Sequence, residues 1–422
     1  MRNTAAQIIH ERHEAGVPSV LQDSYQTGVS EFWAAIPSTP AGIESGPDAV
    51  QDTAQLKARR IVGRRFRHAR NVPMSGTERS LLEKMRELAL ANAEVMLRMD
   101  ESAFADEEAA GNVLPLGSRL VSGSHTPQSL LQGRLHIPSM PGTIRCLTDF
   151  LAGGNTEEQN GNASDERLGH IIRHDIALTL SLLRLVNSPL YEERRGGRNV
   201  ATVREAVAIV GGRQLASLAL AAAEIGGGKM AMHGLSLREF WRHSLMTACL
   251  ASALARQAGF DDPERFFTAG LLHDVGRLLL VDRLGRDVVA LYGDAAAHNT
   301  PFHLAERRVL GFEHGRVGAE LMERWNLDRA LTEAVREHHA QERNMEHPEV
   351  AAVVAVADCM ARALGYGYWH DSHVLPPSGG AWMLLGITMA DLGGIGRQAY
   401  EEFERASFVF DREEEQAERT AA

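Results

Sequence analysis

The sequence of 422 residues predicts an all-α fold, and two observations support this prediction. Almost every readable segment spaces its apolar residues with the helical period of about 3.6 residues, and alternating runs of β-branched residues are nearly absent. Hydrophobic residues make up 44% of the chain and charged residues 23%, which is typical of an ordinary folded globule. The composition excludes a wholly disordered chain, and the length indicates two or three domains.

Residues 1–127 form an N-terminal region of mixed character whose role the sequence does not define. One helix is expected from about 76 to 99, because Ser75 and Glu78 have the spacing of a capping box and an apolar stripe follows them. A basic run extends from Lys57 to Arg70. Residues 100–127 become acidic and then rich in Gly and Ser, so a linker is expected there.

Residues 128–226 are expected to form a first helical lobe. Asp175 is placed to cap an apolar helix that Asn187-Ser188-Pro189 would end. Thr202 and Glu205 have capping-box spacing and open a further helix, which Gly211 would end before another apolar helix through 215–223. A polar insertion at 153–162 is expected to be a loop, and Gly226-Gly227-Gly228 a hinge.

Residues 227–400 are expected to form a second helical lobe, followed by a mobile, charged tail over 401–422. This second lobe holds an unusual density of metal-capable side chains on apolar helices: His243, His273-Asp274, Glu313-His314, Glu337-His338-His339 and Asp358. A lone histidine on a helix more often packs or caps, but buried ionisable groups need partners, so the set as a whole favours a convergent polar site. Imidazole and carboxylate ligands suit Fe, Mn or Zn, and Asp274 could bridge two ions.

The order His243, His273-Asp274, Asp358 resembles the HD superfamily of metal-dependent phosphohydrolases. The resemblance is closer to the HDOD family, the HD-related output domain of bacterial signalling proteins, and covers about residues 130–400. The matching phrases include Ile137-Pro138-Ser139-Met140-Pro141, Asn187-Ser188, Phe240-Trp241-Arg242-His243-Ser244, Leu272-His273-Asp274-Val275-Gly276-Arg277 and Glu337-His338-His339. The resemblance implies a two-lobed helical domain.

The same resemblance implies a ligand set. His243, His273, Asp274 and Asp358 would bind one divalent ion, and His314 and His338 a second. Glu239 lies four residues before His243, on the same helix face, and is a further candidate ligand. The other His-Asp pair, His174-Asp175, falls at a helix start where the family carries an aspartate, so a structural cap is expected there.

Two functions follow from the resemblance. The first is a signal-transduction output or adaptor protein that binds a signalling partner or a small nucleotide ligand, together with one or two metal ions. The alternative is an active metal-dependent phosphohydrolase, in which Asp274 and Arg277 would be catalytic and Arg277 would neutralise charge on a phosphate. Arg277 replaces the lysine frequent in HD hydrolases, and Gly365-Tyr366-Gly367-Tyr368 is not the Gly-Tyr-Pro signature of cyclic-di-GMP phosphodiesterases. Both departures count against phosphohydrolase activity, and the sequence leaves open whether the chain is an enzyme.

The charge balance and the cysteines indicate the surroundings of the protein. The formal net charge is −11, which disfavours bulk binding to nucleic acid or to an anionic membrane. The run from Lys57 to Arg70 leaves a local nucleic-acid contact open, against the simpler reading of a solvated helix face. No apolar run approaches the length of a membrane span, and the three cysteines form no CxxC pair. A cytoplasmic protein without membrane partners is therefore expected.

Overall fold

The structure is a computed structural model, and it describes residues 57–59, 62, 83, 85–86, 89–90, 125–152, 162–211, 232–298, 300–339, 345–369, 371, 373–375, 377, 379–388 and 390–421. Over these residues the secondary structure is helical, with one isolated β-bridge between Tyr368 and Asp371 and no strand. The predicted all-α class is therefore confirmed.

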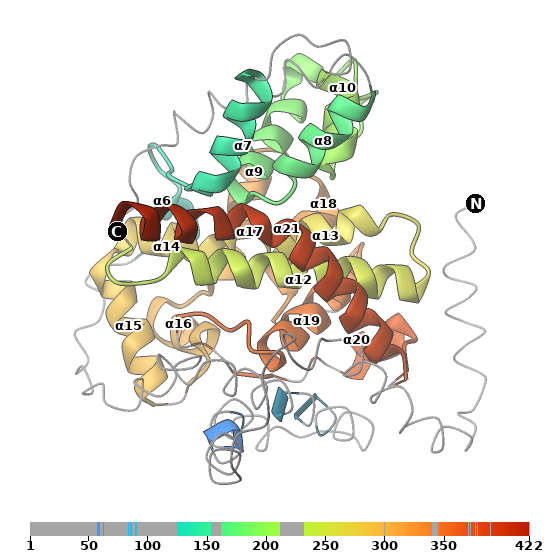
Figure 1. The fold of residues 1–422 in the computed structure, drawn as a ribbon. Helices are drawn as coiled ribbons and strands as arrows, with labels where there is room; N and C mark the ends of the chain where they lie inside the picture. The colour runs from blue at the N-terminus through green and yellow to red at the C-terminus, as the bar shows by residue number, and fades with distance from the viewer. Residues whose placement is uncertain are drawn as a thin grey trace.

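The helices form two lobes, as the sequence predicted. In Figure 1 the helices of the first lobe gather above those of the second. The first lobe contains α7 (Pro141–Ala152), α8 (Asn162–Ile172), α9 (Ile176–Val186), the 3-10 turn η5 (Pro189–Tyr191) and α10 (Val203–Val210). The second contains α12 (Leu237–Ala258), α13 (Pro263–Leu272), α14 (Val275–Leu284), α15 (Arg286–Ala297), α16 (Phe302–Leu310), α17 (His314–Arg324), α18 (Arg329–Glu337), α19 (Pro348–Ala363) and α20 (Gly379–Leu385).

Two further helices connect the lobes. The short α6 (Pro127–Leu130) precedes the first lobe in the chain but packs on α17 of the second. The long α21 (Asp391–Ala421) packs along α12 and also contacts α7 (Figure 1). α21 runs continuously across residue 400, where the sequence analysis placed the start of a charged tail.

Local capping explains where the helices of the first lobe begin and end. The Asp175 carboxylate accepts the backbone N–H of Leu178 and so caps α9, and Asn187 ends that helix. Thr202 accepts from the backbone N–H of Glu205 at the start of α10, and the Glu205 carboxylate accepts in return from the backbone N–H of Ala201. These contacts confirm the predicted starts of both helices.

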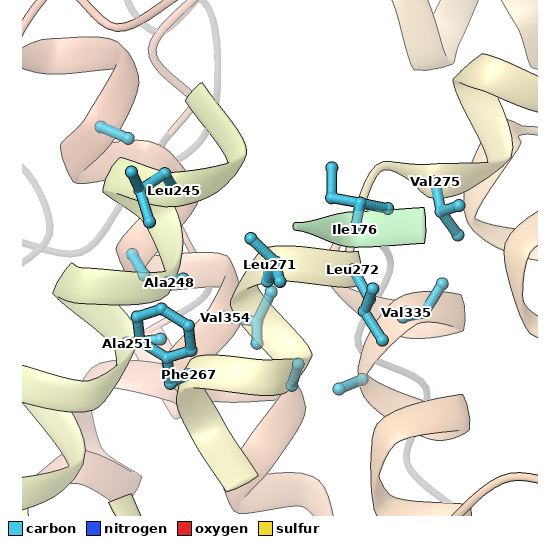
Figure 2. Close-up of a cluster of buried hydrophobic side chains, with 14 of the residues drawn as sticks. Ile176, Leu245, Ala248, Ala251, Phe267, Leu271, Leu272, Val275, Val335 and Val354 are labelled. Carbon is cyan, nitrogen blue, oxygen red and sulfur yellow. The ribbon is translucent and has the colours of Figure 1, made fainter. Parts of the chain in front are cut away.

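The two lobes share one hydrophobic core. Figure 2 shows Ile176, the first residue of α9, in the same cluster of buried hydrophobic side chains as Leu272 and Val275 of the second lobe. Leu272 and Val275 flank the dipeptide His273-Asp274, which joins α13 to α14. The first residue of α9 thus belongs to the same buried cluster as the residues on either side of two candidate metal ligands.

Glycines let three helices of the second lobe approach closely enough to bring their polar ends together. A Cβ atom on Gly276 of α14 would lie 1.9 Å from the carbonyl oxygen of His314 in α17. A Cβ atom on Gly315 would lie 2.8 Å from the carbonyl oxygen of Val335 in α18. Any larger residue would push these backbones apart. The absence of a side chain at both positions therefore holds Asp274, His314 and the end of α18 near one another.

Several predictions fall wholly or mainly outside the described residues: the linker at 100–127, the loop at 153–162, the helix at 215–223 and the Gly226–Gly228 hinge. Of the helix expected at 76–99 the structure describes Glu83, Met85, Arg86, Ala89 and Leu90, all of them helical. Of the basic run it describes Lys57, Ala58, Arg59 and Val62, which are helical too. None of the described helices combines the length and the apolar character that crossing a membrane requires.

Candidate metal centre

The six predicted ligands lie together in the second lobe, and five separate segments of it supply them. His243 lies in α12, His273 and Asp274 form the junction of α13 and α14, and Asp358 lies in α19. His314 begins α17, and His338 directly follows α18. All six are buried, the most accessible being Asp358 with 6% of its surface exposed.

The first donor group surrounds the Oδ2 atom of Asp274. The Nε2 atoms of His243 and His273 lie 3.6 and 3.2 Å from this oxygen and 3.2 Å from each other. Asp358 joins the group, because its Oδ1 atom lies 3.1 Å from Nε2 of His243. Two imidazoles and two carboxylates therefore direct their ligand atoms toward one another.

The second donor group surrounds the other oxygen of Asp274. The Nε2 atoms of His314 and His338 lie 2.8 and 3.6 Å from Oδ1 and 3.3 Å from each other. Asp274 thus presents one carboxylate oxygen to each pair of histidines, which is the arrangement expected of a carboxylate that bridges two ions.

His339 also belongs to the second group, although the sequence analysis selected only His338 from the phrase Glu337-His338-His339. The rings of His338 and His339 have centroids 4.1 Å apart, and His303 stacks on the other face of the group at 4.1 Å from His339. The buried Nε2 atom of His339 finds no hydrogen-bond partner among the described residues. The adjacent pair of histidines was the sequence signal for this second candidate.

In the first group, acceptors on the far ring nitrogens fix the histidine tautomers. Nδ1 of His243 lies 2.8 Å from the carbonyl oxygen of Tyr366, and Nδ1 of His273 lies 2.7 Å from that of Gly270. Because a carbonyl oxygen can only accept, the ring hydrogen belongs on Nδ1 and Nε2 carries a lone pair. Two lone pairs facing each other across 3.2 Å repel unless a cation or a proton lies between them.

The second group is oriented in the same way. Nδ1 of His338 donates to the carbonyl oxygen of Val335 at 2.8 Å, and Nδ1 of His314 donates to Oε2 of Glu306 at 2.7 Å. Glu306 also accepts the backbone N–H of His314 at 2.8 Å. Such outer partners are typical of metal-binding histidines, since they fix the tautomer and direct the free nitrogen inward.

The charges of the site also fit a divalent cation. Among the described residues, ion pairs join six buried charged side chains at the donor groups, four carboxylates and two guanidiniums: Asp274, Glu306, Asp358, Asp371, Arg277 and Arg362. With neutral imidazoles this leaves an excess of two negative charges, and buried charge needs compensation. Burial opposes protonation of His314, but the Glu306 and Asp274 carboxylates outweigh burial and raise the pKa of His314 to about 9. A proton on His314 therefore provides part of the compensation in the metal-free chain.

Arg277 contacts carboxylates of the protein itself. Its Nη2 atom lies 2.9 Å from Oδ2 of Asp371, its Nε atom lies 3.7 Å from Oδ1 of Asp274, and its side chain is fully buried. Burial opposes ionisation of Asp274, yet Arg277 and His273 hold the pKa of this carboxyl well below its usual range. The position predicted for a phosphate-binding cation is thus filled by an arginine engaged in ion pairs.

The segment after α19 completes the site. The carbonyl oxygen of Tyr366 orients His243, and the hydroxyl of Tyr368 donates to Oδ2 of Asp274 at 2.5 Å. Glu239, the further candidate ligand, accepts instead from the backbone N–H of Trp369 at 3.3 Å and lies in neither donor group.

Comparison with known proteins identifies the domain. Residues 144–341 match the family model of the HDOD domain. An uncharacterised protein of Treponema pallidum is 28% identical over 202 residues, which are 46% of this chain and 37% of that protein. Ribonuclease Y of Mycoplasma mycoides is 29% identical over 119 residues, which are 28% of this chain and 18% of the ribonuclease. The matched segments thus span less than two thirds of either relative.

Two solved structures are similar at lower identity. A fragment of the MmoQ response regulator from Methylococcus capsulatus is 22% identical and covers 65% of this chain and 99% of that fragment, with a TM-score of 0.48. An HDOD domain protein of unknown function from Geobacter sulfurreducens is 24% identical and covers 68% of this chain and 97% of that chain, with a TM-score of 0.39.

Proposed function

Since this chain is an HDOD-domain protein, with the domain at residues 144–341, we propose that it is a cytoplasmic signalling protein whose second lobe holds one or two divalent metal ions. The observation that carries the proposal is the pairing of imidazoles about one carboxylate. His243 and His273 face one oxygen of Asp274, while His314 and His338 face the other. Nitrogen lone pairs in this arrangement repel one another unless a cation or a proton lies between them, and Fe, Mn and Zn all accept such ligands.

The residues that would hold the ions are the two donor groups. His243, His273 and Asp358 would hold one ion with Oδ2 of Asp274, while His314, His338 and His339 would hold the other with Oδ1. A bound ion would supply charge neutralisation and Lewis acidity at this point. The side chains of the protein orient the imidazoles and exclude water from them.

The connection to signalling runs through the junction that carries His273 and Asp274. This dipeptide lies between Leu272 and Val275, which belong to the same buried cluster as Ile176 at the start of α9 (Figure 2). A change in the position of Asp274 on metal binding would therefore reach the first lobe through packed side chains. A signalling partner or a small nucleotide ligand would respond to the resulting arrangement of the lobes.

A second candidate function is hydrolysis of a phosphoester, and one observation favours it. Asp274 lies between two donor groups, as a binuclear hydrolase requires. The burial of the site and the engagement of Arg277 by Asp371 count against it, because a phosphate substrate would have to displace a formed ion pair. We therefore place signalling first.

Calorimetric titration of the metal-stripped full chain with Mn²⁺, Fe²⁺ or Zn²⁺ tests the proposal, and we expect binding of one or two equivalents. Hydrogen exchange at the start of α9 should become slower when metal is bound. A hydrolysis assay with bis-p-nitrophenyl phosphate should show no cleavage. Cleavage that disappears in an Asp274→Asn variant would favour the hydrolase instead. Failure of the folded chain to bind any of the three ions would contradict the proposed metal centre and exclude the hydrolase, leaving a signalling protein without metal.

A further inference from the structure

A loop closed at its neck joins α9 to α10 in the first lobe. The Asn187 side chain closes it, because its Oδ1 atom accepts the backbone N–H of Val200 at 2.8 Å and its Nδ2 atom donates to the carbonyl oxygen of Val200 at 2.9 Å. Both residues are buried, so water does not compete for these hydrogen bonds. The segment between them, the 188–199 loop, therefore begins and ends at one point, as Ω-loops do.

Contacts within the 188–199 loop fix its shape. The backbone N–H of Arg195 donates to the carbonyl oxygen of Tyr191 at 3.0 Å, and the buried Arg195 side chain donates from Nη1 to the carbonyl oxygen of Arg198 at 2.8 Å. Gly196 and Gly197 have φ of 64° and 75°, a left-handed conformation that residues with a Cβ atom rarely adopt. The loop is thus ordered by the chain alone, and binding through it costs little conformational entropy.

The loop exposes a large apolar side chain. Leu190, in the middle of η5, has 79% of its surface accessible, the highest value for a large hydrophobic side chain in the described part of the protein. Pro189 is exposed as well, and Tyr191 is half-buried. Holding Leu190 in water contributes nothing to folding, whereas its burial against a partner is favourable. Single exposed leucines are common on protein surfaces, so the charges around Leu190 decide its meaning.

The charges near Leu190 have the opposite sign to the chain as a whole. Residues 184–199 contain four arginines and two glutamates, an excess of two positive charges, whereas the full chain has a formal net charge of −11. Arg184, Arg194 and Arg198 are exposed, and none of them forms an ion pair with another described residue. The Arg194 guanidinium lies 5.9 Å from the centroid of the Tyr191 ring, next to the tip. An apolar tip beside unpaired cations is complementary to a surface on which carboxylates surround an apolar pocket.

The base of the loop also contacts the second lobe. Nδ2 of Asn199 lies 3.4 Å from the carbonyl oxygen of Leu327, and Nδ2 of Asn326 lies 3.5 Å from the carbonyl oxygen of Asn187. Asn326 and Leu327 belong to the turn between α17 and α18, the helices that lead to the second donor group. A partner bound to the loop would therefore lie where the two lobes meet.

We propose that the 188–199 loop is the docking surface for a signalling partner, a protein on which acidic residues surround an apolar pocket. Leu190 would enter the pocket, and Arg194 and Arg198 would pair with the carboxylates. The inference rests on the proposed function in one respect, because that function supplies the signalling partner. The loop itself contains none of the candidate metal ligands. A nucleic acid fits less well, because its phosphates would use the arginines and leave Leu190 in water.

Selection of random peptides displayed on phage tests this inference, with the full chain as target and Leu190→Ser for counter-selection. We expect the enriched peptides to be acidic and to contain a large apolar residue. Fluorescence anisotropy of the synthesised peptides should show binding to the unaltered chain at least about tenfold tighter than to Leu190→Ser, a difference of about 1.4 kcal/mol. The double variant Arg194→Glu/Arg198→Glu should also bind weakly, and salt should weaken binding to the unaltered chain. All of these side chains are exposed, so the variants should fold.

Met383→Ser is the matched control. Met383 of α20 is 72% exposed, so it resembles Leu190 in accessibility and apolar character, but it lies in the second lobe and outside the loop. The selected peptides should bind Met383→Ser and the unaltered chain with equal affinity.

Three results would overturn the inference: no enriched peptide, peptides whose affinity does not depend on Leu190, or an equal loss of affinity in Leu190→Ser and Met383→Ser. Binding of duplex DNA that is lost in Arg194→Glu/Arg198→Glu but kept in Leu190→Ser would assign the loop to nucleic acid and also contradict it. Metal content measured on the same samples separates the two proposals. A chain that holds metal but selects no Leu190-dependent peptide would refute the docking surface alone, and the reverse result would refute the metal centre alone.

Discussion

The dipeptides His174-Asp175 and His273-Asp274 each precede a helix, one in each lobe, and their carboxylates have different partners. Asp175 accepts the backbone N–H groups of Leu178 and Met140 at 2.9 and 2.7 Å, so both of its oxygens serve the fold. Asp274 makes no side-chain capping bond to α14, within the part of the chain that the structure describes. Its oxygens face imidazole nitrogens instead. The same two residues therefore form a structural cap in one lobe and a candidate ligand pair in the other.

The histidines of the two dipeptides differ in the same way. His174 packs edge-on against His170 and Phe267, with ring centroids 4.5 and 5.7 Å away. His273 is held by the carbonyl oxygen of Gly270 and directs Nε2 at Asp274. In this chain, therefore, a His-Asp pair indicates a metal site only where other helices bring further imidazoles to the same carboxylate.

Substituting one glycine in each lobe should give the largest difference in unfolding free energy between the lobes. Gly276→Ala places a methyl group 1.9 Å from the carbonyl oxygen of His314, so α14 and α17 must separate, and we expect a loss of more than about 3 kcal/mol in unfolding free energy. Gly169→Ala in α8 meets only Val207 at 3.6 Å and should be neutral or stabilising by up to about 1 kcal/mol. Urea unfolding of both variants measures this difference. Similar stabilities would refute the role given to close helix approach.

The pH dependence of the stability of the metal-free chain should also distinguish His314 of the candidate metal centre from His174 of the first lobe. The pKa of His314 is raised to about 9 from about 6.5, so protonation of His314 stabilises the folded state. This stabilisation is fully present below pH 6.5 and is lost as the pH rises through 9. The full loss corresponds to about 3 kcal/mol. Burial lowers the pKa of His174, so protonation of this residue disfavours the folded state. Its effect has the opposite pH dependence, because stability is lost as the pH falls below about 6.5.

Urea unfolding of the metal-stripped chain between pH 6 and pH 10 measures this dependence. His314→Gln should flatten the alkaline decrease in stability, whereas His174→Gln should leave it in place. An alkaline decrease that persists unchanged in His314→Gln would show that another group is responsible.

Removing the cap of the first lobe should have a smaller effect. Asp175→Ala leaves the backbone N–H groups of Leu178 and Met140 without their acceptor, so we expect a loss of about 2 kcal/mol in unfolding free energy. The midpoint of urea unfolding at pH 7 measures this loss. Loss of bound metal in the folded variant would contradict a purely structural role for Asp175.

The features that depend on local sequence could be predicted. Asp175 and Thr202 begin helices because their side chains reach backbone N–H groups three residues ahead, which is a relation within one segment. The six candidate ligands could be named because histidine and aspartate in apolar helices are chemically unusual, and because their order resembles a known family. The structure brings all six within one site.

The surroundings of the ligands could not be predicted, because they depend on contacts between distant segments. Glu306 orients His314 from α16, and no pattern in α16 distinguishes this glutamate from a surface residue. Asp371 and Tyr368 reach the site from the segment after α19, where the sequence was considered only for its difference from the Gly-Tyr-Pro signature. Arg362 could have been suspected, since it lies one helical turn after Asp358 and pairs with it.

The most direct test of the metal centre is the metal content of the full chain, purified without chelator or nickel affinity, in three forms: unaltered, Asp274→Asn and Asp175→Asn. We expect one or two equivalents of Fe, Mn or Zn in the unaltered chain and in Asp175→Asn, and nearly none in Asp274→Asn, because Asp274 presents one oxygen to each donor group. Equal metal in all three forms, or none in the folded unaltered chain after reconstitution with each ion, would contradict the account.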